Sequence, residues 1–289
     1  MSPGRALLRI DDALFRERFP LRHFRIAHTL ADHPLFTLER LLRLAQALPE
    51  RAVEYYSGAA AVSQDPSTTP VTGLSLEQTV RDIAVAGSWV ALKYVERDPE
   101  YRALLTECVD ELRAHSERIR PGTHRLEAYI FISSPGSVTP YHFDEEHNFL
   151  LQIRGAKQVH TWTLERAGIT QLDVERIYGG GHRNQPFPDA IGPLAQTFAL
   201  APGDGLHIPV HTPHWVKNGD QVSVSFSVTF RSRRIARDAA VHWLNGRLRR
   251  FGLSPRPPGE AAARDIAKYW TARVAARAER RLRHLGVLR

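Results

Sequence analysis

The spacing of apolar residues changes twice along the chain, which divides the chain into three regions. In residues 1–124 apolar residues recur every three or four positions, the period of an amphipathic helix. The region is therefore predicted to be helical and to pack on the part that follows it. Its strongest helices are predicted over 37–48, 75–87 and 98–119.

In residues 125–230 the period shortens to two, which is typical of β-strands. Many short strands separated by Gly- and Pro-rich turns predict a barrel or jelly roll. Asn218-Gly219 favours a hairpin turn between the last two strands. Residues 164–195 interrupt the pattern and predict a helix-and-loop insertion over one mouth of the barrel. The strands are predicted over 125–134, 138–144, 149–153, 157–162, 196–200, 206–210, 214–218 and 221–230.

Residues 231–289 return to helical spacing and carry most of the positive charge. They hold 16 Lys and Arg against 4 Asp and Glu, which leaves 23 basic and 27 acidic residues in 1–230. A basic tail can meet nucleic acid or an acidic protein surface. Because 35 of the 39 basic residues of the chain are Arg, genome composition explains much of the excess, and nucleic-acid binding is not expected. The apolar face around Trp270 predicts packing on the body of the protein or on a second copy, and the second alternative is a homodimer through the C-terminal helices.

Composition favours a reducing, aqueous compartment. The single cysteine, Cys108, lies in a helical pattern and is predicted to be a buried thiol with no catalytic role. No apolar run approaches the roughly 20 residues that a membrane span needs, and the charged N-terminus does not resemble a signal peptide. We expect a cytoplasmic protein with no membrane association.

The candidate chemistry begins with His142 and Asp144, two positions apart on a predicted strand. Alternation directs both side chains to the same face and Phe143 to the other. A third imidazole would complete the 2-His-1-carboxylate set that holds non-haem Fe(II) and leaves three positions open. His214 follows a Gly/Pro loop at the start of a later strand and is the preferred third ligand. His211, in the middle of that loop, is the competitor.

The segments TPYHFDEEHNFLLQIRGAKQVHTW and APGDGLHIPVHTPHWVKN resemble the jumonji-C/cupin-8 oxygenases. The resemblance covers about residues 125–230 and implies a mainly β core with helical flanks: a double-stranded β-helix (jelly-roll/cupin) barrel with N-terminal and C-terminal α-helices. It also implies Fe(II) held by His142, Asp144 and His214, with no further catalytic residue.

The same resemblance implies a site for 2-oxoglutarate. The asparaginyl-hydroxylase branch of the family binds the distal carboxylate of this cosubstrate with a threonine three residues before the first ligand and a lysine fifteen after it, here Thr139 and Lys157. An asparagine six after the first ligand lines the pocket, here Asn148. The family often carries S-F-N in the final strand, whereas this chain has Ser225-Phe226-Ser227, a departure that affects one cosubstrate or water contact.

Lys157 supports a cosubstrate site on physical grounds as well, because a lysine inside a barrel is costly unless it meets an anion. The alternative is that it follows a turn and points into solvent. His147 is a candidate for orienting a ligand or contacting substrate, although a structural role is preferred for it, and His160 is expected to face outward. In the insertion, His182 and Arg183 are candidates for substrate contacts from a lid, with a surface loop as the alternative.

These features together predict an Fe(II)/2-oxoglutarate-dependent dioxygenase. It would hydroxylate a protein or peptide side chain, or a small molecule, with consumption of O₂ and release of succinate and CO₂. One alternative is a cupin metalloenzyme that does not use 2-oxoglutarate and has no need of Lys157. The other is a non-enzymatic regulatory or binding module that acts through a nucleic-acid-binding basic tail.

Overall fold

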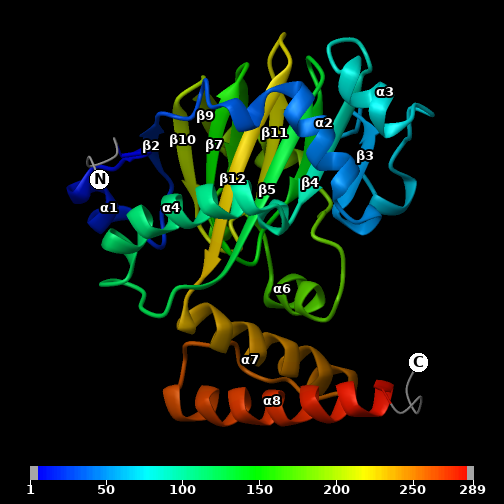
Figure 1. The fold of residues 1–289 in the computed structure, drawn as a ribbon. Helices are drawn as coiled ribbons and strands as arrows, with labels where there is room; N and C mark the ends of the chain where they lie inside the picture. Colours follow the sequence, from blue (N-terminus) through cyan, green and yellow to red (C-terminus); the bar gives the residue numbers. More distant parts are fainter. Residues whose placement is uncertain (1–5, 285–289) are drawn as a thin grey trace. The chain divides into compact units, whose positions relative to one another are not determined.

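The computed structural model describes residues 6–284, in which every strand pairing is antiparallel and the strands form two sheets (Figure 1). The larger sheet has eight strands in the order β1-β2-β10-β7-β12-β5-β4-β3, and the smaller has four in the order β6-β11-β8-β9. The strands of the larger sheet are β1 (Leu8–Arg9), β2 (Phe24–His28), β3 (Val53–Ser57), β4 (Ser88–Lys93), β5 (His124–Ser133), β7 (His147–Arg154), β10 (Asp204–Ile208) and β12 (Ser223–Arg231). Those of the smaller sheet are β6 (Val138–His142), β8 (Lys157–Thr161), β9 (Gln196–Leu200) and β11 (His214–Asn218).

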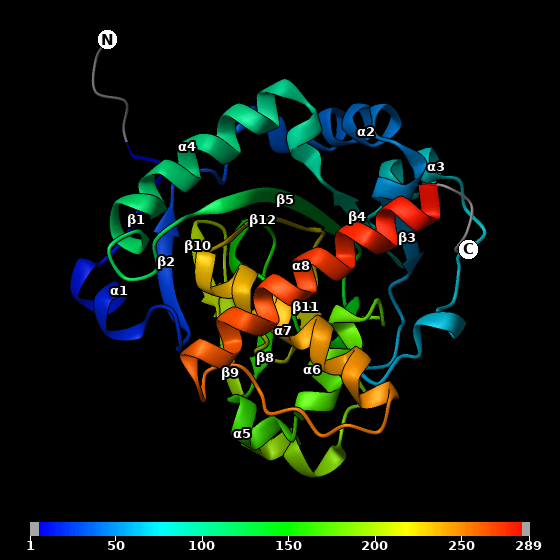
Figure 2. The ribbon, with the colours of Figure 1, turned by 90° about the horizontal axis from the view of Figure 1, so that it is seen from below.

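The double-stranded β-helix predicted from the sequence is confirmed. From β5 to β8, and again from β9 to β12, successive strands alternate between the two sheets, which is the connectivity of a jelly roll. Figure 2 shows β5 and β12 on one side of the barrel and β8, β9 and β11 on the other. All eight predicted strands exist, with ends that differ from the prediction by a few residues.

The N-terminal region contains the predicted helices and also four strands that the periodicity missed. β1 and β2 extend the larger sheet beyond β10, and β4 and β3 extend it beyond β5. These strands are short, and their pairing with distant segments decides their conformation more than their own pattern does. In this region and in the insertion, the helices of the first compact unit are α1 (Asp12–Arg18), α2 (Leu38–Ala47), α3 (Leu76–Arg81), α4 (Pro99–Ser116) and α5 (Leu164–Ala167).

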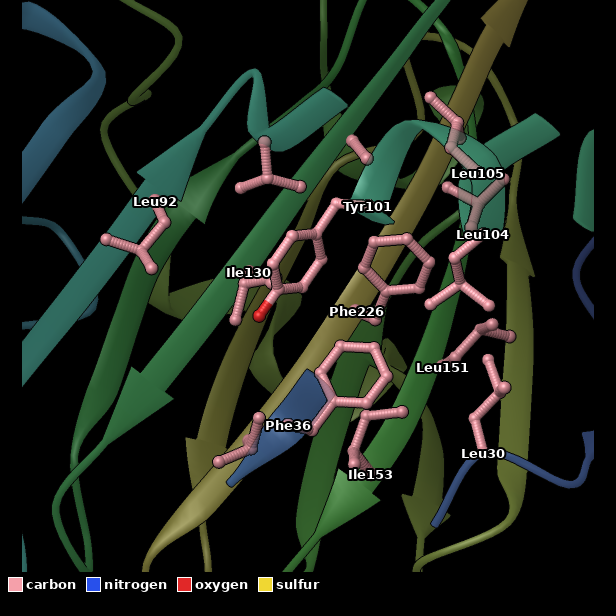
Figure 3. Packing of buried hydrophobic residues seen from close by; sticks show 14 of the residues in the cluster. Leu30, Phe36, Leu92, Tyr101, Leu104, Leu105, Ile130, Leu151, Ile153 and Phe226 are labelled. Carbon is pink, nitrogen blue, oxygen red and sulfur yellow. The ribbon is translucent and has the colours of Figure 1, made fainter. Parts of the chain in front are cut away.

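The main hydrophobic core lies between the helices and the outer face of the larger sheet (Figure 3). Phe226 of β12 packs against Phe36, with ring centroids 5.3 Å apart, and Phe36 meets Tyr101 of α4 edge-on. Cys108 is fully buried in the same cluster, as its helical pattern predicted, and burial raises the pKa of its thiol to about 12. A second, smaller cluster around Leu150, Val159 and Val216 lies on the inner face of the barrel.

The chain divides into two compact units, and the second consists of residues 168–183 and 232–289. Within it the predicted C-terminal helices are present, and two ion pairs join its helices. The Glu175 carboxylate accepts hydrogen bonds from Arg249, and the Glu279 carboxylate accepts two from Arg247. Across residues 6–284, no helix combines the length and the apolar character that crossing a bilayer requires. The helices of this unit are α6 (Gln171–Tyr178), α7 (Arg233–Arg250) and α8 (Ala262–His284).

Candidate metal centre

The three predicted ligands come together at one end of the barrel. His142 is the last residue of β6, and His214, the first of β11, is its direct partner across the smaller sheet. Asp144 lies two residues beyond β6, and its two carboxylate oxygens are 4.0 Å from His142 Nε2 and 3.9 Å from His214 Nε2. One donor atom from each residue lies within 4.8 Å of the other two. The sequence therefore predicted the cluster correctly, although Asp144 stands on the loop after the strand.

Backbone carbonyls fix the tautomer of both imidazoles. His142 Nδ1 is 2.7 Å from the carbonyl oxygen of Pro140, and His214 Nδ1 is 3.0 Å from that of Thr212. Since a carbonyl can only accept, each Nδ1 carries the proton and donates it. This leaves Nε2 of each ring as the atom that faces the cluster and could bind a metal ion.

The donor set fits a divalent transition metal. Two imidazoles and one carboxylate form the facial triad that non-haem Fe(II) enzymes use, and this arrangement leaves coordination positions for other ligands. His211, the rival third ligand, is placed differently. It occupies a left-handed turn with φ of 60°, and its backbone N–H donates to the Asp144 carbonyl. The main chain of His211 thus links the loop before His214 to the loop that carries Asp144.

Lys157 lies inside the barrel with only 5% of its surface exposed. It alternates with exposed Gln158 and shares a face with Val159, a member of the inner apolar cluster. Within the described part of the chain, its ammonium group has no hydrogen-bond or ion-pair partner, and burial lowers its pKa to about 7. The prediction that this lysine is buried rather than solvent-directed is confirmed. A buried cation without a partner is suited to an anionic ligand.

Thr139 faces the same interior because of a bulge. A threonine three residues before His142 would point to the opposite face of a regular strand. In the ladder between β6 and β11, however, His142 pairs with His214 whereas Thr139 pairs with Val216, so β6 contains one extra residue. Directly paired residues share a face, and Val216 belongs to the inner cluster. Thr139 and Lys157 therefore both face the barrel interior.

Asn148 and Ser227 are close to the metal ligands. The Asn148 amide nitrogen lies 3.3 Å from Asp144 Oδ2, and the Ser227 hydroxyl lies 2.7 Å from the Asn148 amide oxygen. Both residues are buried, with 6% and 1% of their surface exposed. The sequence pointed to both positions, but not to the contact between them.

His147 is not brought to the metal ligands. It neighbours Asn148 on β7 and so faces the other side of the sheet, where its ring packs against Phe19 and Phe230. His207 donates its Nδ1 proton to the Arg22 carbonyl and accepts a hydrogen bond at Nε2 from His147 Nδ1, 3.3 Å away. Burial lowers the pKa of His147 to about 3. This environment agrees with the structural role that was preferred for His147.

The other candidate histidines and the acidic residues after Asp144 lie outside the metal cluster. His160 faces outward as expected and stacks on Trp215 with a centroid distance of 4.0 Å. Glu145 and Glu146 both accept hydrogen bonds from Arg231, at 2.8 and 3.2 Å. His182 and Arg183 belong to the second compact unit, so a substrate contact by either remains a prediction.

His23, which lies just before β2 in the N-terminal region, was not among the predicted site residues. The Thr161 hydroxyl donates to the Pro213 carbonyl, 3.0 Å away, and accepts from His23 Nε2, 2.9 Å away. Burial, followed by the proximity of His214, lowers the pKa of His23 to about 3. His23 therefore supports the segment that carries the third ligand.

Residues 111–237 match the family described as the JmjC domain. This part of the chain is a JmjC domain. Its boundaries enclose both ligand segments and all eight strands of the barrel. The matched residues include His142, Asp144 and His214, the cluster that could hold a metal ion.

Two kinds of known protein are similar to this chain. The X-ray structure of Escherichia coli YcfD matches with a TM-score of 0.53 and 19% identity, over 93% of this chain and 68% of that one. A structure of YcfD described as a ribosomal oxygenase in complex with cobalt and 2-oxoglutarate matches with a TM-score of 0.50 and 18% identity, over 94% and 68%. At this identity the likeness shows the fold alone. Lysine-specific demethylase 8 of Xenopus tropicalis is 31% identical over 107 residues, which span 33% of this chain and 22% of the demethylase.

Proposed function

We propose that this protein is an Fe(II)- and 2-oxoglutarate-dependent oxygenase that hydroxylates its substrate and releases succinate and CO₂. The proposal rests on the surroundings of Lys157. Its side chain is buried inside the same barrel as the triad, and its amino group has no partner among residues 6–284. The triad by itself would fit many cupin metalloenzymes. An unneutralised cation in the barrel adds a reason to expect an anionic cosubstrate.

In this proposal His142, Asp144 and His214 hold the iron through two Nε2 atoms and one carboxylate. Bound there, Fe(II) would supply the redox chemistry that couples decarboxylation of the 2-oxo acid to hydroxylation. Lys157 would bind the distal carboxylate of 2-oxoglutarate by a charge-assisted hydrogen bond, and the Thr139 hydroxyl would add a second. The apolar residues of the inner cluster would keep water from the cosubstrate.

A protein or peptide side chain is the preferred substrate class. The named relatives are a ribosomal oxygenase and a lysine-specific demethylase, so both act on or with macromolecules according to their names. A small molecule is the second candidate. The cytoplasm remains the expected compartment.

We also propose that the protein is a homodimer through its C-terminal helices. Ile266, Trp270 and Val274 lie four residues apart on α8 and are 46%, 59% and 66% exposed, so they form one apolar row. A second copy would cover such a row. We do not propose nucleic-acid binding, because Arg247 and Arg249 of the basic tail form ion pairs with Glu279 and Glu175.

The test is succinate formation from 2-oxoglutarate with Fe(II), ascorbate and O₂. We expect His214→Ala to abolish succinate formation, and His211→Ala to retain most of it, because His214 belongs to the three-residue cluster and His211 does not. Fe(II) binding without any turnover of 2-oxoglutarate by the wild-type protein would favour the cupin enzyme that uses no such cosubstrate.

A further inference from the structure

We propose that Ser227 and Asn148 are positioning residues that hold the Asp144 carboxylate in the orientation needed to bind the metal. The inference rests on the proposed function in one respect, namely that a divalent metal ion binds at the triad. It assigns to these two residues a role toward the metal ligand rather than toward the cosubstrate.

Asp144 needs such support because the sheet does not fix its side chain. His142 and His214 lie within strands, and their rings are locked by carbonyls of the neighbouring backbone. Asp144 lies in the loop that leaves β6, where its main-chain carbonyl is held by His211 N–H. The orientation of its carboxylate depends on side-chain partners, of which Asn148 is one, through Nδ2 at 3.3 Å from Oδ2.

The Asn148 amide has only one useful orientation here. An ionised carboxylate accepts hydrogen bonds and cannot donate, so the NH₂ group of Asn148 must face Asp144. The amide oxygen then points the other way and needs a donor, since a buried acceptor without one costs about 1–3 kcal/mol. Ser227 supplies that donor at 2.7 Å, which favours the productive orientation over the flipped one.

Both residues lie on strands in the interior of the larger sheet. β12 lies between β7 and β5, and β7 lies between β10 and β12, so neither strand is at an edge. The hydrogen bonds from Ser227 to Asn148 and from Asn148 to Asp144 therefore connect the rigid sheet to a ligand on a loop. Support of this kind typically changes metal affinity by about 10–100-fold when it is removed.

The same strand provides a matched control. Ser225, two residues before Ser227 and on the same face, donates its hydroxyl to the Gln152 amide oxygen, also at 2.7 Å. It is fully buried, as Ser227 nearly is. Loss of either hydroxyl removes a buried hydrogen bond of the same kind and length, but only Ser227 connects through its amide partner to a metal ligand.

The experiment is titration of the metal-free full chain with Co(II), followed by visible absorption, with thermal unfolding of each metal-free variant recorded in parallel. We expect Ser227→Ala to weaken Co(II) binding about tenfold, while Ser225→Ala binds as the wild type does. Both variants should lose similar thermal stability. Ser227→Thr keeps the hydroxyl and should bind Co(II) as tightly as the wild type does. Ser227→Val has nearly the same shape as Ser227→Thr but no hydroxyl, and it should bind Co(II) weakly. The Thr and Val pair provides the comparison should Ser227→Ala fail to fold.

Equal Co(II) affinity of the wild type, Ser227→Ala and Ser227→Val would overturn the positioning role while leaving the metal site intact. Equal weakening by Ser225→Ala and Ser227→Ala would overturn it too, because the effect would then be one of general packing. If the wild-type protein binds no Co(II), the metal site itself is wrong and the positioning role is wrong with it.

Discussion

The pKa of Lys157 makes the affinity for 2-oxoglutarate depend on pH in a way that can be calculated. Burial lowers this pKa to about 7, so the ammonium form is only about half populated near neutral pH before the cosubstrate binds. Only the charged form can pair with the distal carboxylate. The apparent Kd for 2-oxoglutarate should therefore increase by the factor 1 + 10^(pH − pKa), which is about 1.1 at pH 6, about 11 at pH 8 and about 100 at pH 9.

Lys157→Arg is the informative variant, because a guanidinium stays charged across this range and binds carboxylates well. We expect its affinity for 2-oxoglutarate to change little between pH 6 and pH 9, whereas Lys157→Met should bind weakly at every pH. The assay is calorimetric titration of 2-oxoglutarate into Mn(II)-loaded protein. All three proteins share the metal ligands, so pH effects on metal and cosubstrate are common to them. The ratio of the wild-type affinity to the Lys157→Arg affinity therefore reports only the titration of Lys157. If that ratio is the same at pH 6 and pH 9, Lys157 does not bind the cosubstrate as a titrating cation.

Two further predictions concern other parts of the protein. Burial keeps His147 neutral in the folded state, with its pKa lowered from 6.5 to about 3, so the unfolded state binds more protons below pH 6.5 and stability falls as the pH decreases. His147→Gln should reduce the slope of unfolding free energy against pH by about 1.3 kcal/mol per pH unit between pH 4.5 and 5.5 in urea denaturation, and an unchanged slope would contradict the neutral, buried state. Trp270→Glu should convert the proposed dimer into a monomer by light scattering, since it places a charge in the apolar row of α8; a wild-type mass of one chain, about 32.6 kDa, would already exclude the dimer.

The metal ligands could be predicted because the motif that specifies them is local. His142 and Asp144 are two residues apart, and that spacing brings them together whether or not the strand continues to Asp144. The expected reason was strand alternation, but β6 ends at His142 and Asp144 lies on a loop. His214 was identified by its place at the start of a strand after a turn, which is where the structure has it.

Features that depend on distant segments were harder to predict. The four N-terminal strands are short, and β2 and β4 form ladders with β10 and β5, which follow them by many residues. His23 was missed for the same reason, because its partner Thr161 is 138 residues away. Local periodicity contains no information about such contacts, whereas it did predict the strands of the barrel and the long helices.

Thr139 shows how a one-residue irregularity can decide which side chains share a site. By alternation alone, an offset of three from His142 places Thr139 on the outer face, away from Lys157. The extra residue in β6 reverses this, because it moves Thr139 into register with Val216 on the inner face. The bulge includes Pro140, whose carbonyl also fixes the His142 tautomer. The bulged segment therefore contributes to both parts of the proposed site. Its Pro140 carbonyl orients the His142 ring, and its extra residue turns Thr139 toward the proposed cosubstrate pocket.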